Sequence, residues 1–420
     1  MRIDVKNEIW GSLSQKLLGK KILVIGTGSI AIFKTPEIVR ELIRHGANVN
    51  VMLSPDAAKI VSPTVFEWAS GEKVILDISG GIEHVVFAGE HDQKVDLIIV
   101  CPFTANTLGK FVHGIADSNV TLTLMTALGS NIPLLFVPGM HEPMYNNPIV
   151  RENLDKLKKL PNTTVINPKI EENKAKIPDM TVIVHWVIKL LTPQKLLNKN
   201  ILITGGPTNE FIDKVRFISN PSTGKMGYNI ALESWYQGAS VLFIVGPNSL
   251  PKHELFPTIS ITSALEMAEL IKKTLQQKNY DYAFFSAAVA DFTPVAYTDD
   301  KIKSSVSELS INLKSTPKII KLVKELKNAN IGSKLKVIAF KAEYNKTIEE
   351  LQEICQPYLS QNLADLMVSN LIGNEDSGFA VDSSEVHIFA KSGSPISIKG
   401  TKQNIAFKLV QLIIEKFESQ

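Results

Sequence analysis

Small polar residues follow the first two apolar segments of the chain. Gly26-Thr-Gly-Ser-Ile-Ala31 has the Gly-x-Gly-x-x-Ala spacing, in which glycines let the backbone approach a phosphate. A dinucleotide site carries an acidic residue at the end of the second segment, but here Met52-Leu53 leads into Ser54-Pro55. A hydroxyl suits a phosphate better than a ribose diol, so the pattern favours a mononucleotide such as FMN over NAD. A tight turn with a helix cap is the competing interpretation of this motif alone.

Two further apolar segments end in side chains of the same kind. Val95–Cys101 leads into Pro102-Phe-Thr-Ala-Asn-Thr107, and a segment from about 133 to 137 leads into Pro138-Gly-Met-His-Glu-Pro-Met144. Because α/β sheets bind ligands at the carboxyl ends of parallel strands, such groups can contact a flavin ring without steric obstruction. Their repetition at consecutive strand ends predicts one flavin site, with the candidate residues Gly28, Ser29, Ser54, Thr104, Ala105, Asn106 and Thr107.

The second half of the chain holds its densest motif. Gly205-Gly-Pro-Thr208 is followed by Asn220-Pro-Ser-Thr-Gly-Lys-Met-Gly227, directly before a predicted helix. Glycines beside Ser and Thr offer free backbone N–H groups at the positive end of a helix dipole, which suits a triphosphate. No Gly-Lys-Ser/Thr closes the motif, so it is not a P-loop. A capped helix after a long loop is the alternative, but the polar content of the loop argues against a simple connection.

A carboxylate and two lysines follow this motif. The predicted strand Tyr282–Ser286 leads into Ala287-Ala-Val-Ala-Asp291, which places Asp291 at a strand end as a candidate Mg²⁺ ligand or ribose contact. Lys301 and Lys303 lie in a loop of alternating charge. A solvated lysine pair is the usual interpretation of such a loop, and a phosphate clamp is the alternative.

The elements that position these residues alternate between strands and helices. Strands are predicted at Lys21–Gly26 and Asn48–Leu53 around a helix of about 35–45, and at Asn200–Gly205 and about 239–245 around a helix of about 225–237. This order predicts βαβ units and parallel sheets covered by helices on both faces. Since Thr192-Pro193 does not readily continue a helix, we predict two doubly wound, Rossmann-like α/β domains, 1–192 and 193–420.

The composition excludes several classes of protein. With 45 basic and 42 acidic residues, the net charge of +3 lacks the strong excess of positive charge that is typical of nucleic-acid-binding proteins. The 2 cysteines form no disulfide framework. Residues 1–21 lack the apolar core of a signal peptide, and no stretch reaches the roughly 18 apolar residues of a membrane span. We therefore expect a soluble cytoplasmic protein that binds neither nucleic acid nor membrane.

On its motifs and His84, the first half resembles the FMN-binding, homo-oligomeric cysteine decarboxylases, including phosphopantothenoylcysteine decarboxylase. The resemblance implies a flavodoxin-like fold and FMN at a trimer contact, hence at least a trimer. It also implies that FMN oxidises the substrate thiol, so that the carboxylate leaves as carbon dioxide. His84 matches the catalytic histidine. His141 stands where the family has an asparagine that holds the substrate carboxylate, so Met140 and His141 are candidates for substrate binding.

One feature of that family is missing here. Bacterial members carry a cysteine on a flap after the Pro138–Met144 motif, but residues 150–200 contain none. Either another donor serves, with Lys174 and Lys176 as candidates, or the decarboxylase is impaired.

The second half is similar to phosphopantothenate–cysteine ligase. The resemblance implies that CTP activates phosphopantothenate as an acyl-cytidylate, which cysteine then attacks. It implies that Asn220 stabilises the acyl intermediate, that Lys301 neutralises phosphate charge, and that Phe340 lies against the base. The resulting candidates for nucleotide binding are Gly206, Ser222, Thr223, Gly224, Ser286, Ala287, Asp291, Lys301, Lys303 and Phe340.

Together the halves imply consecutive steps of coenzyme A biosynthesis, with phosphopantothenate, cysteine and phosphopantothenoylcysteine as substrates. Domain 1–192 is then the FMN-dependent decarboxylase, and domain 193–420 is the ligase, using CTP and Mg²⁺. Two alternatives stay open: a ligase with a degenerate decarboxylase domain, and a non-catalytic regulatory flavoprotein subunit.

Overall fold

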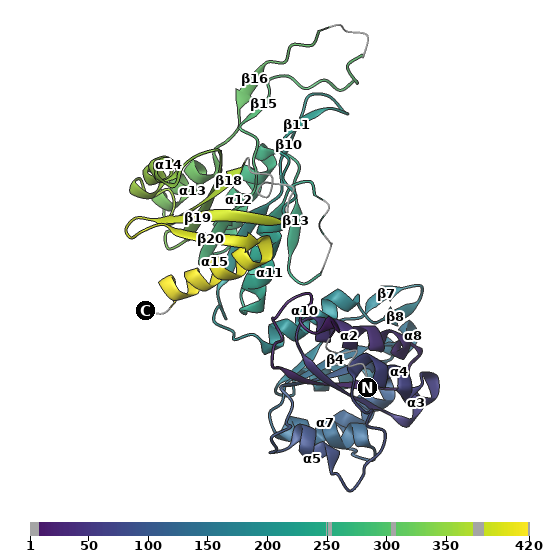
Figure 1. Cartoon of the computed structure of the whole chain (residues 1–420). Helices are drawn as coiled ribbons and strands as arrows, with labels where there is room; N and C mark the ends of the chain where they lie inside the picture. Colours follow the sequence, from purple (N-terminus) through teal and green to yellow (C-terminus); the bar gives the residue numbers. More distant parts are fainter. Residues whose placement is uncertain (1–7, 249, 251–253, 304–307, 373–381, 419–420) are drawn as a thin grey trace. The chain divides into compact units, whose positions relative to one another are not determined.

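The computed structural model describes residues 8–248, 250, 254–303, 308–372 and 382–418. The chain divides into two compact units, Met1–Thr192 and Pro193–Gln420. Figure 1 shows each unit as a sheet with helices packed around it. Each unit is considered separately below.

The sheet of the first unit has the order β2-β1-β3-β4-β6, and each neighbouring pair is parallel. The predicted strands at 21–26 and 48–53 are confirmed residue for residue, whereas the third strand, predicted at 95–101, both begins and ends two residues later, at Leu97 and Phe103. The strands of this sheet are β1 (Lys21–Gly26), β2 (Asn48–Leu53), β3 (Leu97–Phe103), β4 (Leu134–Pro138) and β6 (Thr163–Val165).

Helices cover both faces of this sheet, because alternate residues of each strand point to opposite sides. Leu23 and Ile25 pack with apolar residues of α6 and α7. Helix α2 contacts β2 and packs against α4 and α10. The helices are η1 (Ile30–Lys34), α2 (Thr35–Arg44), α3 (Pro55–Ile60), α4 (Pro63–Ser70), α5 (Glu83–Ala88), α6 (Ala105–Val112), α7 (Asn119–Gly129), α8 (Glu142–Tyr145), α9 (Pro148–Lys158) and α10 (Met180–Leu191).

The sheet of the second unit has the order β13-β12-β9-β14-β17-β18-β19-β20. It is parallel from β13 to β18, as predicted, but β19 and β20 add an antiparallel edge that the sequence did not predict. Its strands are β9 (Asn200–Gly205), β12 (Ser240–Val245), β13 (Thr258–Ser260), β14 (Tyr282–Phe285), β17 (Lys336–Tyr344), β18 (Leu366–Ile372), β19 (Ser383–Ala390) and β20 (Ile396–Thr401).

Two helical layers also enclose this sheet. Leu202 and Ala283 belong to a core with apolar residues of α12, α13 and α14, while α11 packs against α15 and against β9 and β12. The predicted helix at 225–237 is confirmed as α11. The helices are α11 (Lys225–Tyr236), α12 (Ala264–Gln277), α13 (Ile319–Asn328), α14 (Ile348–Ser360) and α15 (Lys402–Phe417).

Smaller strand pairs lie outside the main sheets. In the first unit, β5 (Met140–His141), β8 (Lys174–Lys176) and β7 (Lys169–Glu171) form a flap. In the second unit, β10 (Asn209–Phe211) pairs with β11 (Phe217–Ser219), and β15 (Phe292–Pro294) with β16 (Leu313–Ser315). These last two pairs form an arm that extends from the body of the second unit (Figure 1).

The strand orders place a reversal of direction in each sheet. The chain leaves β1 for one edge and returns to β3 on the other side of β1, and it does the same around β9 and β14. Crevices at such switch points, outside the carboxyl ends of the strands, are where doubly wound folds bind ligands. The loops after β1 and β3 and those after β9 and β14 are therefore the expected ligand-binding positions.

Candidate functional site

A cavity of about 740 Å³ lies at the switch point of the first unit. This volume is within the range of small-molecule and cofactor sites. Its walls contain all the residues that the sequence suggested for FMN, and Met140 and His141 as well. The structure therefore brings together Gly28, Ser29, Ser54, Thr104, Ala105, Asn106, Thr107, Met140 and His141.

Hydroxyl groups at helix starts define one side of this cavity. Ser54 Oγ accepts a hydrogen bond from the Ala57 backbone N–H (3.2 Å) at the start of α3. Thr104 Oγ1 accepts one from the Thr107 N–H (3.4 Å) at the start of α6, and Ser29 caps η1. A hydroxyl that accepts a capping bond keeps its own proton for donation to a phosphate or a flavin carbonyl. Capping and ligand binding are therefore compatible here.

Close contacts between the loops explain two positions of the Gly-x-Gly motif. A Cβ added to Gly28 would lie 2.7 Å from Asp56 Cβ, so a larger residue would push the start of α3 away. Thr27 Oγ1 donates to the Pro102 carbonyl (2.7 Å) and accepts from the Thr104 N–H (3.2 Å). Thr27 thus joins the ends of β1 and β3, a role that the motif, which leaves this position unspecified, could not reveal.

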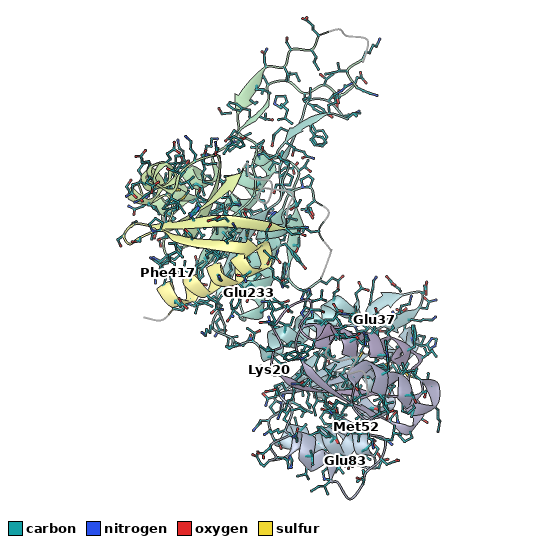
Figure 2. All side chains as sticks on the ribbon, viewed as in Figure 1. Lys20, Glu37, Met52, Glu83, Glu233 and Phe417 are labelled. Atoms are coloured by element: carbon teal, nitrogen blue, oxygen red, sulfur yellow. The ribbon has the colours of Figure 1, made fainter. Side chains whose placement is uncertain are left out.

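His84 lies outside the described walls of this cavity. It is the second residue of α5 and is partly buried; Figure 2 labels its neighbour Glu83 at the start of this helix. Helix α5 packs against α7, whose residues Val120 and Thr121 line the cavity. Ile82, immediately before α5, has φ +46, a left-handed conformation that is strained for a β-branched residue. Within one chain, His84 is therefore not among the described residues that line the cavity with the predicted flavin residues.

The flap gives different surroundings to Lys174 and Lys176, the two candidates to replace the missing flap cysteine. His141 lies directly opposite Lys174 in the β5–β8 pair, and both side chains are exposed. Lys176 instead forms ion pairs with Glu171 (3.6 Å) and Glu172 (2.8 Å). The register thus places Lys174, rather than Lys176, beside a cavity residue.

Neither cysteine offers a reactive thiol. Cys101 and Cys355 are both buried. Burial raises the pKa of the Cys101 thiol to about 12 and that of Cys355 to about 11. Since the thiolate is the reactive form, both side chains act as apolar packing groups.

A second cavity, of about 450 Å³, lies at the switch point of the second unit. It draws its walls from the end of β9, the loop after β14, the segment before α11 with the start of that helix, the residues around the start of α13, and β17 and β18. Of the residues predicted to bind nucleotide or to act on the acyl group, it includes Asn220, Ser222, Thr223, Gly224, Ser286, Ala287, Asp291 and Phe340.

Asn220 is held by the loop that follows β14. Its side-chain Nδ2 donates to the carbonyls of Ala288 (3.1 Å) and Val289 (3.3 Å). The same loop is fixed by Thr208, a fully buried residue whose Oγ1 accepts from the Ala290 N–H (3.0 Å). These bonds fix the Asn220 amide against the cavity wall before any ligand binds. The sequence motif contained Thr208 but gave no reason to assign it this role.

Glycines bring the start of α11 against the sheet. Gly224, the N-cap of α11, has φ +75, and a Cβ there would lie 3.2 Å from the Gly206 nitrogen. Gly206 also has φ +75 and lies behind Gly224, outside the described cavity walls. The left-handed conformation at both positions favours glycine. Gly206 thus contacts the residue that lines the cavity.

Lys301 and Lys303 also lie outside the described walls, in the arm. Both are exposed, whereas Ile302 between them is anchored: its N–H donates to Asp213 Oδ2 (3.0 Å), and its carbonyl accepts from Arg216 (3.1 Å). Burial raises the pKa of Asp213, but the N–H groups of Arg216, Val215 and Ile302 and the Arg216 guanidinium outweigh it, so the pKa is well below its usual value. The anchor therefore stabilises the arm above the ordinary carboxyl range and is lost as pH falls through the lowered pKa.

The charge of the second cavity is unbalanced. Among the described residues that line it, Asp291 is the one carboxylate, and it forms an ion pair with Lys318. The described walls contain four lysines, none of which was selected from the sequence: Lys225, Lys318, Lys341 and Lys402. In the described part of the chain, no three His, Cys, Asp or Glu side chains form a metal cluster. The cavity therefore suits an anionic ligand.

Comparison with known proteins agrees with this two-part arrangement. A family model described as Flavoprotein matches residues 11–192, and one described as DNA/pantothenate metabolism flavoprotein C-terminal domain matches residues 196–417. The coenzyme A biosynthesis bifunctional protein CoaBC of Thermococcus kodakarensis is 40% identical over 401 residues, which cover 96% of this chain and 96% of that protein. The chain belongs to the CoaBC family.

Other CoaBC proteins match over the same span. Those of Methanocaldococcus jannaschii and Escherichia coli K12 are 34% and 30% identical, covering 96% of this chain and 95% and 99% of their own length. The predicted family, the α/β fold and the bifunctional decarboxylase and ligase are thereby confirmed. No helix in the described part of the chain combines the length and the apolar character that a membrane span requires.

Proposed function

We propose that the second unit joins cysteine to 4'-phosphopantothenate with CTP, and that the first unit decarboxylates the product, phosphopantothenoylcysteine, to phosphopantetheine with FMN. One observation carries this proposal: each unit has its own cavity at the switch point of its sheet, and each is lined by a different predicted set of residues. The product of one cavity is the substrate of the other.

The donor set of the first cavity fits FMN. Ser29, Ser54 and Thr104 offer hydroxyl protons toward a phosphate or a ring carbonyl, and Gly28 permits close approach. When bound, FMN would supply the oxidation of the substrate thiol and the return of the electrons. The protein would hold the substrate carboxylate through His141 until it leaves as carbon dioxide.

The second cavity fits the activation of a carboxylate by transfer of a cytidine monophosphate group from CTP. The phosphopantothenate carboxylate would attack the α-phosphorus of CTP, releasing pyrophosphate and forming an acyl-cytidylate. The cysteine amine would then displace CMP. The anchored Asn220 amide would stabilise the acyl centre, and Phe340 would contact the base. Lys301 lies in the arm, outside the described walls, so it would neutralise developing phosphate charge once the arm brings it to a bound nucleotide. Since Mg²⁺ is commonly held by one or two carboxylates plus substrate phosphates, Asp291 fits a metal that arrives with the nucleotide.

An oligomer of at least three chains would complete the first site. His84 lies outside the cavity of its own chain, while Ile30 and Met144, which line that cavity, are 73% and 50% exposed. Related decarboxylases place FMN at a trimer contact, and a neighbouring chain would cover this apolar rim. We propose that His84 of one chain serves the cavity of the next.

Lys174 is proposed to replace the missing flap cysteine. Lys174→Met is expected to slow decarboxylation by roughly 100-fold, because the variant removes a proton donor opposite His141. Lys176→Met is the matched control: it removes only exposed ion pairs, which contribute little. Carbon dioxide release and flavin absorbance are measured for both. Equal rates for the Lys174 variant and the wild type, or equal losses for both variants, would refute the assignment.

A coupled assay tests the whole proposal. Purified protein is expected to be yellow and, given phosphopantothenate, cysteine and CTP, to form products with the masses of phosphopantothenoylcysteine and then phosphopantetheine. Replacing CTP with ATP is expected to reduce the first product, and the comparison measures nucleotide preference. The buried thiols and the cysteine-free flap favour one alternative, a degenerate decarboxylase. Yellow protein that stops at the first product would establish that alternative, and yellow protein with no product would indicate a regulatory subunit.

A further inference from the structure

Part of the wall of the second cavity belongs to the apolar core of its unit. Met267, Phe285 and Ile319 line the cavity and are buried in the core formed by α12, α13 and α14 against the sheet. Ile320 and Tyr358 also line the cavity and pack against the same core. We call these five residues the apolar side of the cavity. Since burying a charge there would be costly, an uncharged part of a ligand is expected to occupy this side.

The apolar side lies across the edge of the sheet from the start of α11. Strand β14 ends at Phe285, which belongs to the apolar core. The next residue, Ser286, lies toward α11, because a Cβ added to Gly227 of that helix would lie 2.8 Å from Ser286 Oγ. The cavity therefore reaches from one face of the sheet to the other over the end of β14. A ligand with phosphates at the start of α11 would extend its uncharged part to the apolar side.

The end of α14 holds Tyr358 in place. Cys355, which lies one turn earlier on the same face of the helix, is buried in the apolar core. The Tyr358 carbonyl accepts hydrogen bonds from the backbone N–H groups of Leu363 (2.8 Å) and Ala364 (3.1 Å), which close the end of the helix. Pro357, directly before Tyr358, restricts the backbone further because its ring fixes φ. The backbone of Tyr358 is therefore positioned before any ligand binds.

Tyr358 gives the apolar side its one hydroxyl group. The other four members are Met, Phe and Ile side chains, which offer at most a weakly accepting thioether. The phenol of Tyr358 can both donate and accept a hydrogen bond, and its ring presents a flat face. A nucleobase is likewise flat and carries donors and acceptors along its edge. The branched acyl chain of phosphopantothenate is not planar and gains less from an aromatic face, so the base suits this side better.

We propose that Tyr358 recognises the base of the nucleotide: its ring packs against the base, and its hydroxyl forms a hydrogen bond with the edge of the base. This inference rests on the proposed ligase function and adds a specificity-determining residue to it. Aromatic packing alone tolerates any base, because every base has a flat face. A hydrogen bond to the edge discriminates, because a wrong base leaves a polar group unpaired. Tyr358 therefore contributes to the choice of nucleotide as well as to its affinity.

Tyr358→Phe, Tyr358→Leu and the control Tyr344→Phe test the proposal by titration calorimetry; Tyr344, at the end of β17, is 70% exposed. Tyr358→Phe is expected to weaken CMP binding by roughly 2- to 10-fold, the loss of one neutral hydrogen bond. Tyr358→Leu should weaken it by about a further 10-fold through loss of the aromatic contact. Inorganic triphosphate, which has no base, and phosphopantothenate should bind every variant as they bind the wild type. In the amide assay, the kcat/KM ratio of CTP to ATP should fall in Tyr358→Phe and stay unchanged in Tyr344→Phe.

Each other outcome has a distinct meaning. Wild-type affinity for CMP in both Tyr358 variants would overturn the proposal. A loss confined to phosphopantothenate would also overturn it and would assign the apolar side to the acyl chain. Equal losses for CMP and inorganic triphosphate, with a lower melting temperature, would show a purely structural role. A wild-type protein that binds no cytidine nucleotide would contradict the proposed function itself, whereas CMP binding that does not depend on Tyr358 would remove only this residue's role.

Discussion

Replacing Asn220 with alanine is expected to slow amide formation by roughly 100- to 1,000-fold, the loss typical of removing one preorganised donor from an acyl-transfer site. The structure gives a physical reason for so large an effect. The Asn220 Nδ2 group donates to the carbonyls of Ala288 and Val289, which hold the amide at the cavity wall, and one of these two bonds is exchanged for the acyl oxygen when charge develops on it. Alanine removes the amide, and the carbonyls of Ala288 and Val289 then lose their hydrogen bonds to it. The measurement is the rate of phosphopantothenoylcysteine formation from saturating CTP, phosphopantothenate and cysteine.

The chain supplies an internal control for this variant. Decarboxylation of added phosphopantothenoylcysteine should proceed at the wild-type rate, because the first cavity belongs to a separate compact unit. Asn229→Ala is a matched control in the same unit, since its side chain bonds only to the Lys225 carbonyl within α11 among the contacts described. Full amide synthesis by the Asn220 variant would remove the role assigned to this residue.

The main sheets and most cavity residues could be predicted because their signals are local. Buried strands such as β1 and β9 are continuous apolar runs, and both end at glycine turns. Parallel strands bring their carboxyl ends to one edge, so polar residues after those strands converge whatever the details of the loops. That reasoning sufficed for Gly28, Thr104 and Asn220, which do line the two cavities.

The residues that were missed depend on contacts distant in sequence. Lys402 follows the antiparallel edge formed by β19 and β20, and no motif near it indicates that α15 begins at the nucleotide cavity. Asp213 is similarly cryptic: its importance comes from bonds to Arg216 and to Ile302, which is 89 residues away. Such partners come together only in the folded chain, so local sequence patterns cannot predict these contacts.

His84→Asn is expected to slow decarboxylation by roughly 100- to 10,000-fold, the range for loss of a general acid or base. Asparagine keeps a hydrogen-bonding side chain at the start of α5 but does not titrate near neutral pH. The flavin absorbance should remain, since His84 lies outside the described cavity walls, and amide synthesis should be unchanged. His91→Asn, at an exposed loop position, is the matched control. Carbon dioxide release from phosphopantothenoylcysteine is measured for each variant, and a wild-type rate for His84→Asn would exclude a catalytic role.

Co-expression can decide whether His84 acts on its own chain or on a neighbour. Gly28→Val is expected to spoil the flavin cavity, because an added Cβ would lie 2.7 Å from Asp56 Cβ. If His84 serves the next chain, mixed oligomers of His84→Asn and Gly28→Val chains contain some sites that combine an intact cavity with an intact histidine. Random assembly makes about one site in four competent, so about a quarter of the wild-type rate should return. If His84 acts within its own chain, every site retains one defect, and no mixture of the two variants regains activity.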